Sequence, residues 1–151
     1  MKKVLFVCLG NICRSPMAEG LMKAYVTQNS LAIMVDSAAT SSWEQGNRPH
    51  QGTQAILKKL AIDSSQMISR QVCLANFQTF DFIIGMDQQN VDDLRQIAPI
   101  DCQEKIYRYL SVLPETENQS VPDPYFTGDF EETYQLLLAG LDKWVAKIMA
   151  E

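Results

Sequence analysis

The sequence predicts an α/β fold, with one domain over residues 1–151 in which helices cover both faces of a parallel sheet. Two observations carry this prediction. Short apolar runs rich in β-branched residues alternate along the chain with segments whose apolar residues recur at helical spacing. The length of 151 residues also suits a single hydrophobic core, which at this size buries roughly 70% of the surface that the unfolded chain exposes.

The first elements are marked by clear patterns. Residues 3–7 form an apolar run that is typical of a strand buried on both faces, and the run leads directly into Cys8. A helix is expected from Pro16, because proline suits a first helical turn and apolar residues follow at helical spacing. The same alternation then predicts strands at residues 33–35, 82–84 and, more weakly, 106–107, and helices at residues 54–60 and 91–97.

The last segment predicts a helix that closes the domain. Apolar residues recur on one face over residues 130–148, and Asp129 and Glu132 are spaced as an N-cap and its reciprocal acceptor. Two stretches, residues 39–50 and 111–128, lack periodicity. Long loops in a compact α/β domain often carry function, so both are expected at the rim of a site.

The overall charge limits the partners that the protein is expected to have. A formal net charge of −5 disfavours broad attraction to nucleic acid or to an anionic membrane, since both require a cationic face. The apolar run at residues 4–9 is short and is not followed by a cleavage site of small residues. The expectation is a cytoplasmic protein that binds neither nucleic acid nor membranes.

The four cysteines are expected to be reduced thiols rather than a disulfide framework. They are Cys8, Cys13, Cys73 and Cys102. No C-x-x-C pair occurs and His50 is the only histidine, so the ligands and spacing of a structural zinc site are missing. No metal is expected.

The segment Cys8–Ser15 lies between the first expected strand and the first expected helix. Backbone N–H groups of a tight loop that enters a helix converge on one point and form a cradle for a tetrahedral anion. Gly10 and Asn11 suit such a loop because both tolerate positive φ. The segment lacks the glycines and lysine of a Walker nucleotide-binding loop.

Within this loop a cysteine lies six residues before an arginine. The loop N–H groups, Arg14 and the Ser15 hydroxyl are expected to favour the thiolate of Cys8, which makes it a nucleophile without a histidine. Arg14 can bind two phosphate oxygens at once through its planar fork. The structural alternative is that Cys8 is a small buried residue and Arg14 a solvated charge. The position between strand and helix favours the catalytic interpretation.

Several motifs together resemble those of the low-molecular-weight protein tyrosine phosphatase family, and the resemblance covers the whole chain. The loop continues into Pro16-Met17-Ala18-Glu19. Residues 36–41 with Trp43, the pair Met86-Asp87, and Asp123-Pro124-Tyr125 complete the similarity. The resemblance implies one phosphatase domain over residues 1–151 with a four-stranded parallel sheet and no cofactor. It also implies a reaction through a phosphocysteine, with tyrosine-phosphorylated proteins as partners and inorganic phosphate as a product.

The resemblance also implies roles for individual residues. Cys8 attacks phosphorus, Arg14 binds the phosphate oxygens, and Asp123 acts as general acid and then as general base. From its spacing alone, Asp123 between two prolines could equally shape a turn. Trp43 and Tyr125 are expected to hold the phosphotyrosine ring, with Phe126 a weaker candidate. Phosphate binding or support of the loop is expected from Leu9, Gly10, Asn11, Ile12, Cys13, Ser15 and Ser37.

Other residues are expected to be structural. Asp87 is interpreted first as a helix N-cap, with support of the site as an alternative. His50 is expected at the surface near the Trp43 loop and without a chemical role. Cys73 and Cys102 are expected to be buried small residues. Cys8 is expected to be an exposed, redox-sensitive thiolate that Cys13 can capture as a disulfide after oxidation.

Three other functions compete with the tyrosine phosphatase. Arsenate reduction in relatives uses two further cysteines close together, whereas Cys73 and Cys102 are far apart. Relatives that dephosphorylate arginine carry threonine where this chain has Ile12. A catalytically dead phosphate-binding module is disfavoured because Cys8, Arg14 and Asp123 are all present.

Overall fold

The centre of the molecule is a four-stranded parallel sheet in the order β2-β1-β3-β4. The computed structural model describes all residues, 1–151. The strands are β1 (Lys2–Cys8), β2 (Ile33–Ala39), β3 (Phe82–Gly85) and β4 (Ile106–Arg108). β1 pairs on both sides and is buried on both faces from Val4 to Cys8, which explains its continuous apolar run. The predicted α/β fold with a parallel sheet is confirmed.

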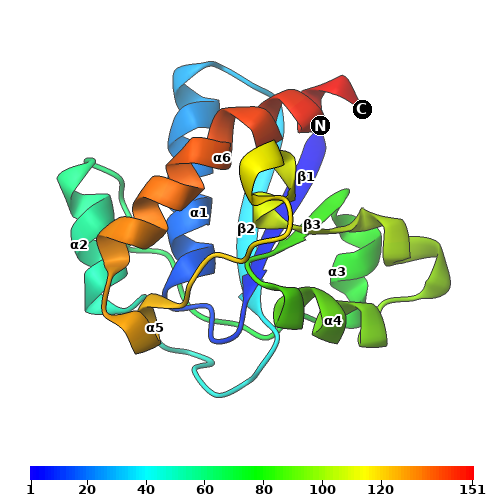
Figure 1. Cartoon of the computed structure of the whole chain (residues 1–151), viewed down its shortest axis with the longest axis horizontal. Coiled ribbons are helices and arrows are strands. Elements are labelled where there is room, and N and C mark those ends of the chain that lie inside the picture. Colours follow the sequence, from blue (N-terminus) through cyan, green and yellow to red (C-terminus); the bar gives the residue numbers. More distant parts are fainter.

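Helices cover both faces of this sheet. One side carries α1 (Arg14–Gln28), α2 (Gln51–Lys59) and α6 (Phe130–Ala150), and the other carries α3 (Leu74–Thr79) and α4 (Gln88–Ile97) (Figure 1). Phe6 packs with Trp144 in the core on the α1 and α6 side. Its neighbour Leu5 packs with Phe77 in the core on the opposite side. Adjacent residues of β1 therefore feed two separate hydrophobic cores.

The helices begin earlier than their apolar periodicity indicated. α1 begins at Arg14 rather than at Pro16, α2 at Gln51 and α4 at Gln88. The first turns are polar, so the apolar repeat starts only after them. Helix α3 was missed, because six residues with a single buried side chain, Phe77, are too short to show a period. None of the helices combines the length and apolar character needed to cross a membrane.

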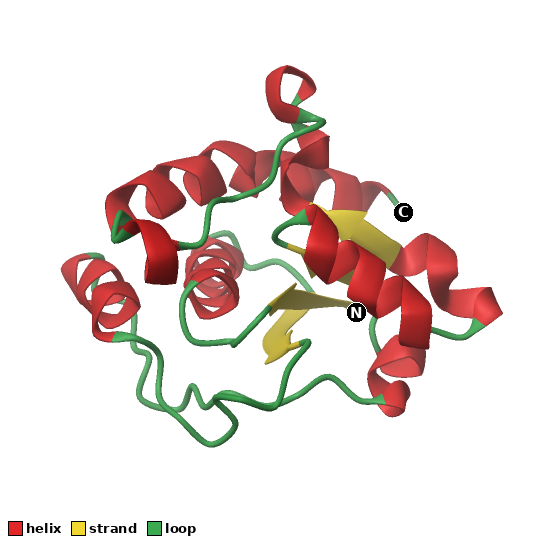
Figure 2. Ribbon diagram, turned by 60° about the horizontal axis from the view of Figure 1, so that its bottom comes forward, coloured by secondary structure: helices red, strands yellow, loops and turns green.

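The segment at residues 111–128, expected to be a loop, contains short helical turns. The 3₁₀ helix η3 (Pro114–Thr116) and the short helix α5 (Pro124–Thr127) lie within it, and the 3₁₀ helix η2 (Tyr109–Val112) ends in it. A further 3₁₀ helix, η1 (Ile100–Lys105), comes before β4. Figure 2 shows the strands enclosed between the helices, with long loops connecting them. From β1 the chain crosses to β2 on one side, and from β3 it crosses to β4 on the other side, so the strand order reverses between β1 and β3. This is the topological switch point of the sheet. Ligands commonly bind at such points.

Candidate active site

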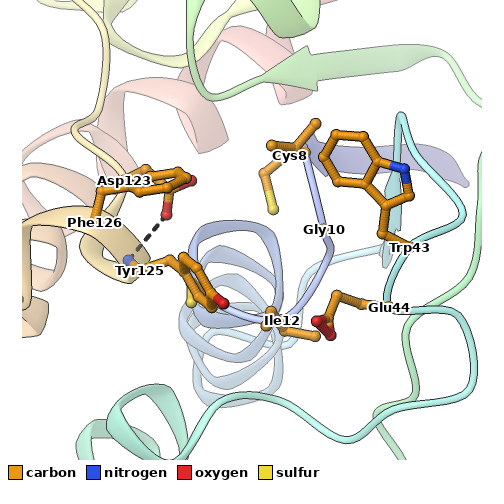
Figure 3. A pocket seen from close by; sticks show the side chains of 10 residues that line it. Cys8, Gly10, Ile12, Trp43, Glu44, Asp123, Tyr125 and Phe126 are labelled. Carbon is orange, nitrogen blue, oxygen red and sulfur yellow. Dashed lines mark hydrogen bonds between the residues drawn. The ribbon is translucent and has the colours of Figure 1, made fainter.

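A pocket of about 160 Å³ lies at the carboxyl end of β1. In Figure 3 the Cys8 thiol points into this pocket, with Trp43 on one side and Asp123 and Tyr125 on the other. Its lining residues are Cys8, Leu9, Gly10, Ile12, Cys13, Trp43, Glu44, Asp123, Tyr125 and Phe126. The structure thus brings together the loop and both of the aperiodic segments that the sequence indicated.

The loop after β1 directs N–H groups toward the sulfur of Cys8. The backbone N–H of Asn11 donates to Cys8 Sγ at 3.3 Å, and that of Ser15 does so at 3.5 Å. Asn11 has a φ of 56°, whereas Gly10, also expected to use positive φ, does not. Cys13 is the N-cap of α1 without a side-chain cap bond. Donors and the helix N-terminus therefore favour a negative charge here.

The carbonyl groups of the same loop bond away from the pocket. Five of them accept a hydrogen bond from a residue of a distant segment, which favours N–H groups that face inward. The donors are Thr40 N to Cys8 O, Ser41 N to Leu9 O, Ser69 Oγ to Gly10 O, His50 N to Ile12 O, and Thr53 Oγ1 to Cys13 O. These anchors were not identified from the sequence. No local spacing signals them, because they come from three separate segments.

Asn11 joins the loop to the neighbouring strand through its side chain. Its Nδ2 atom donates to Ser15 Oγ at 2.7 Å and to Ser37 Oγ at 2.9 Å. Ser15 Oγ in turn lies 3.1 Å from Cys8 Sγ. The three polar side chains expected to support the loop are therefore in one network with the sulfur.

Arg14 lies at the start of α1 and is 2% exposed. Its Nη1 atom donates to Asp87 Oδ2 at 2.7 Å and to Val121 O at 3.0 Å, and its Nη2 atom donates to Asp123 Oδ2 at 3.3 Å. Burial lowers the pKa of Arg14, but the negative charges of Cys8, Asp87 and Asp123 outweigh it and raise the pKa above its usual value. The guanidinium thus stays charged.

The Nε atom of Arg14 is buried and has no hydrogen-bond partner in the protein. A buried unpaired N–H is costly, so an N–H held in this state next to the pocket suits an incoming anion. Nη2 has two N–H groups and gives only one hydrogen bond, to Asp123. Two donors of one planar group are thus available for the oxygens of a phosphate.

Asp123 combines two contacts. Its Oδ1 atom accepts the backbone N–H of Tyr125 at 3.1 Å and so caps the short helix α5. Its Oδ2 atom pairs with Arg14, and the side chain lines the pocket. Asp123 therefore does shape the turn through Oδ1, and its Oδ2 atom is left for a chemical role.

Aromatic side chains form the rim. Trp43 is 77% exposed and Tyr125 is 58% exposed, so neither is core packing. Phe126 also lines the pocket and packs edge-on against Tyr125. His50 is half-buried: it caps α2, stacks on Phe130 and lies edge-on to Tyr125. The expectation of a surface position is corrected to a half-buried one, in which the ring packs against Tyr125 of the rim.

Two cysteine expectations are also corrected. Cys8 is only 2% exposed rather than openly exposed, and its sulfur is reached through the pocket. Cys73 is exposed at the start of α3, whereas Cys102 is buried as expected. Burial, together with the negative charges of Cys8 and Asp123, raises the pKa of the Cys13 thiol from 9.0 to about 12.

Asp87 was identified from the sequence as an N-cap, and this is confirmed. Its Oδ1 atom accepts the Asn90 N–H at 2.7 Å at the start of α4. The contact of its other oxygen with Arg14 makes it part of the site as well. A local capping signal thus found the residue but not its partner 73 positions away.

Comparisons with known proteins agree with this geometry. The family described as "Low molecular weight phosphotyrosine protein phosphatase" matches residues 3–151. The chain is 43% identical over 153 residues to low molecular weight protein-tyrosine-phosphatase YfkJ of Bacillus subtilis, covering 100% of this chain and 98% of that protein. The crystal structure of YfkJ matches with a TM-score of 0.95 over 99% of this chain and 96% of that chain.

Two further solved structures are similar. The low molecular weight protein tyrosine phosphatase SP-PTP from Streptococcus pyogenes has 48% identity and a TM-score of 0.87, covering 98% of this chain and 93% of that chain. The drosophila arginine phosphatase DARP has 32% identity and a TM-score of 0.89, covering 97% of each chain.

Proposed function

The chain belongs to the low molecular weight phosphotyrosine protein phosphatase family, and we propose that its reaction is carried out by Cys8, Arg14 and Asp123. It is a protein tyrosine phosphatase, a cysteine-dependent hydrolase. One observation carries the assignment of residues. The sulfur of Cys8 receives two backbone N–H groups at the carboxyl end of β1, beside a buried guanidinium with an unpaired Nε.

In the first step the Cys8 thiolate attacks the phosphorus of phosphotyrosine. An S–P bond forms while the bond from phosphorus to the phenolic oxygen breaks, and Asp123 donates its proton to that oxygen. The inward N–H groups and Arg14 stabilise the charge spread over the three equatorial oxygens. Tyrosine leaves, and the phosphoryl group stays on Cys8.

In the second step Asp123, now a carboxylate, takes a proton from water. The water oxygen attacks phosphorus, the S–P bond breaks, and inorganic phosphate leaves with the Cys8 thiolate restored. The pairing of Asp123 with Arg14 holds the Oδ2 atom beside the group that binds phosphate, where both steps require it.

The rim supports an aryl substrate. Trp43 and Tyr125 lie on opposite sides of the pocket, and Ile12 also lines it (Figure 3). Aromatic pairs of this kind add about 0.5–1.5 kcal/mol beyond the burial of area. An apolar branched chain at position 12 can pack on a phenyl ring but cannot hydrogen-bond a guanidinium.

We further propose that the whole chain, residues 1–151, acts as one phosphatase domain in the cytoplasm. The nucleophile works only as a reduced thiol, which a reducing compartment maintains. The partners are tyrosine-phosphorylated proteins.

Turnover of matched phosphotyrosine, phosphoarginine and phosphoserine peptides tests the proposal. We expect the highest kcat/KM on phosphotyrosine. Arg14→Lys should lose most of this activity, because an ammonium cannot bind two phosphate oxygens as a fork. Faster hydrolysis of phosphoarginine by the unmodified protein would replace the proposed substrate, and near-normal activity of Arg14→Lys would remove Arg14 from the mechanism.

A further inference from the structure

Glu19 is a buried acid that the proposed reaction does not use. It lies in α1 and is 5% exposed. Its Oε1 atom accepts the hydroxyl of Ser37 on β2 at 2.5 Å, and its Oε2 atom lies 2.5 Å from Nζ of Lys23, whose side chain is 51% exposed. A buried carboxylate is tolerated only when it is paired and hydrogen-bonded. One of its two partners, Ser37, also contacts the loop of the active site.

The hydroxyl proton of Ser37 can be donated to only one of its neighbours. A carboxylate can only accept hydrogen bonds, so the Ser37 hydroxyl must donate to Glu19, which leaves its oxygen free to accept from Asn11 Nδ2 at 2.9 Å. The orientation of the Asn11 amide is fixed independently. The backbone N–H of Arg70 can only donate, and it donates to Asn11 Oδ1 at 3.2 Å.

The chain of hydrogen bonds continues from Asn11 through Ser15 to the sulfur of Cys8. The Nδ2 group of Asn11 also donates to Ser15 Oγ at 2.7 Å, so the Ser15 oxygen is an acceptor in that contact. Its own proton is left for the remaining contact, Cys8 Sγ at 3.1 Å. A donor held toward the sulfur favours the thiolate over the thiol, because hydrogen bonds to a charged form stabilise it.

We propose that Glu19 is a positioning residue. By accepting the Ser37 hydroxyl it holds the Ser37 oxygen as an acceptor for Asn11, which keeps the Asn11 amide placed to donate to Ser15 and thereby favours the thiolate of Cys8. The inference rests on the proposed function, in which that thiolate is the nucleophile. Lys23 balances the charge of Glu19, so Glu19 acts through Ser37 rather than by repelling the sulfur. The Glu19 end of the chain faces a second pocket of about 340 Å³, lined also by Lys23, so it is remote from the substrate.

Alkylation of Cys8 by iodoacetamide, followed across pH by peptide mass mapping, tests this inference. Glu19→Met removes the hydrogen-bond acceptor and keeps a side chain of similar size. We expect the pH midpoint of Cys8 alkylation to rise by about one unit relative to the wild-type protein. At a pH below the midpoints of both proteins, this shift means about tenfold slower alkylation of the variant. Glu19→Gln should move it less, because its amide oxygen can still accept from buried Ser37 while exposed Lys23 turns to water. Gln66→Ala changes the same second pocket without touching the chain and should keep the wild-type midpoint.

A double-mutant comparison separates this role from general damage to the fold. Ser37→Ala should shift the midpoint in the same direction, and adding Glu19→Met to it should shift the midpoint no further. The charged and titratable groups around the pocket stay unchanged in these variants: Cys13, Arg14, Glu44, Asp87 and Asp123. If Glu19→Met does not fold, the alkylation midpoints of Ser37→Ala and Glu19→Gln are compared with that of the wild-type protein instead.

The inference is overturned if the folded Glu19 and Ser37 variants alkylate with the wild-type midpoint. Failure of the proposed function has a different signature. In that case Cys8 of the unmodified protein would not be protected from iodoacetamide by inorganic phosphate, whatever the Glu19 variants do.

Discussion

Oδ2 of Asp87 lies 2.7 Å from Nη1 of Arg14, so the residue that caps α4 also holds the guanidinium at the pocket. Asp87 follows β3, and Arg14 begins α1, the helix after β1; β1 and β3 are adjacent strands at the switch point of the sheet. The pairing of Asp87 with Arg14 orients the guanidinium before any substrate is present. It also occupies Nη1, which leaves Nε and Nη2 for phosphate.

Asp87→Asn should separate the capping role from the positioning role. Asparagine is a good N-cap, so the melting temperature should change little. The loss of a charged hydrogen bond, worth about 1.5–3 kcal/mol, should lower kcat/KM about 10- to 100-fold on a phosphotyrosine peptide. Asp129→Asn is the matched control, since Asp129 caps α6 without contacting Arg14. Equal kinetics for the two variants would leave Asp87 with capping alone.

Asp123→Asn should distinguish acid catalysis from turn formation. The amide oxygen of asparagine can still accept the Tyr125 N–H and cap α5, but the side chain cannot donate an acidic proton. We expect both Asp123→Asn and Asp123→Ala to lower the rate about 10²–10⁴-fold, and most for substrates with poor leaving groups. Rates would be measured on a series of aryl phosphates. A wild-type rate for Asp123→Asn would return this residue to its turn-forming role.

The Cys8–Cys13 pair should respond to peroxide in a pH-dependent manner. Peroxide converts the Cys8 thiolate to a sulfenic acid, and the Cys13 thiolate then attacks that sulfur and displaces hydroxide. Because the pKa of Cys13 is about 12, its thiolate fraction rises with pH up to that value. Disulfide formation should therefore quicken as pH rises, and a thiol reductant should restore activity.

Mass mapping after peroxide treatment checks this redox prediction. Cys13→Ala should lead to overoxidation of Cys8 and loss of recovery by reductant. Cys102→Ala is the control, because Cys102 is buried in the core behind the sheet and does not line the pocket. The prediction is wrong if Cys8 of the unmodified protein is overoxidised and never linked to Cys13.

Ile12→Thr should shift substrate preference toward phosphoarginine. Threonine keeps the branched shape in the pocket lining and adds a hydroxyl. Leaving a polar group unpaired in a closed site costs about 1–3 kcal/mol. We expect the ratio of kcat/KM values for phosphoarginine over phosphotyrosine to rise. Ile12→Val, which changes size without adding a hydroxyl, is the control. An unchanged ratio in Ile12→Thr would mean that position 12 does not select the substrate.

The loop of the active site could be predicted because its signals are local. The strand, the loop and the helix are consecutive, so Cys8 and Arg14 are fixed relative to each other within one short segment. Asp123 was identified through the family motif, although its two oxygens have separate partners that spacing alone could not reveal.

The anchors of the loop could not be predicted because they depend on how distant segments pack. Ser69 bonds Gly10 across 59 positions, and Thr53 bonds Cys13 across 40. Neither lies in a motif, and a single serine or threonine hydroxyl gives no pattern. The sequence places Glu19 in the family motif but does not reveal its contact, because Glu19 lies on α1 and its partner Ser37 lies on β2.

The phosphocysteine is the central claim, and rapid quenching of a turnover reaction tests it directly. Asp123→Asn should slow the release of phosphate from Cys8, whereas an aryl phosphate with a good leaving group needs little acid catalysis in the first step. Such an aryl phosphate mixed with this variant and quenched in acid should therefore leave phosphorus on the enzyme. The account predicts one phosphoryl group, mapped by mass spectrometry to Cys8, and none in Cys8→Ser, which should still bind phosphate without turnover. Continued hydrolysis by Cys8→Ser, or phosphate release with no adduct on Cys8 at any quench time, would contradict the account.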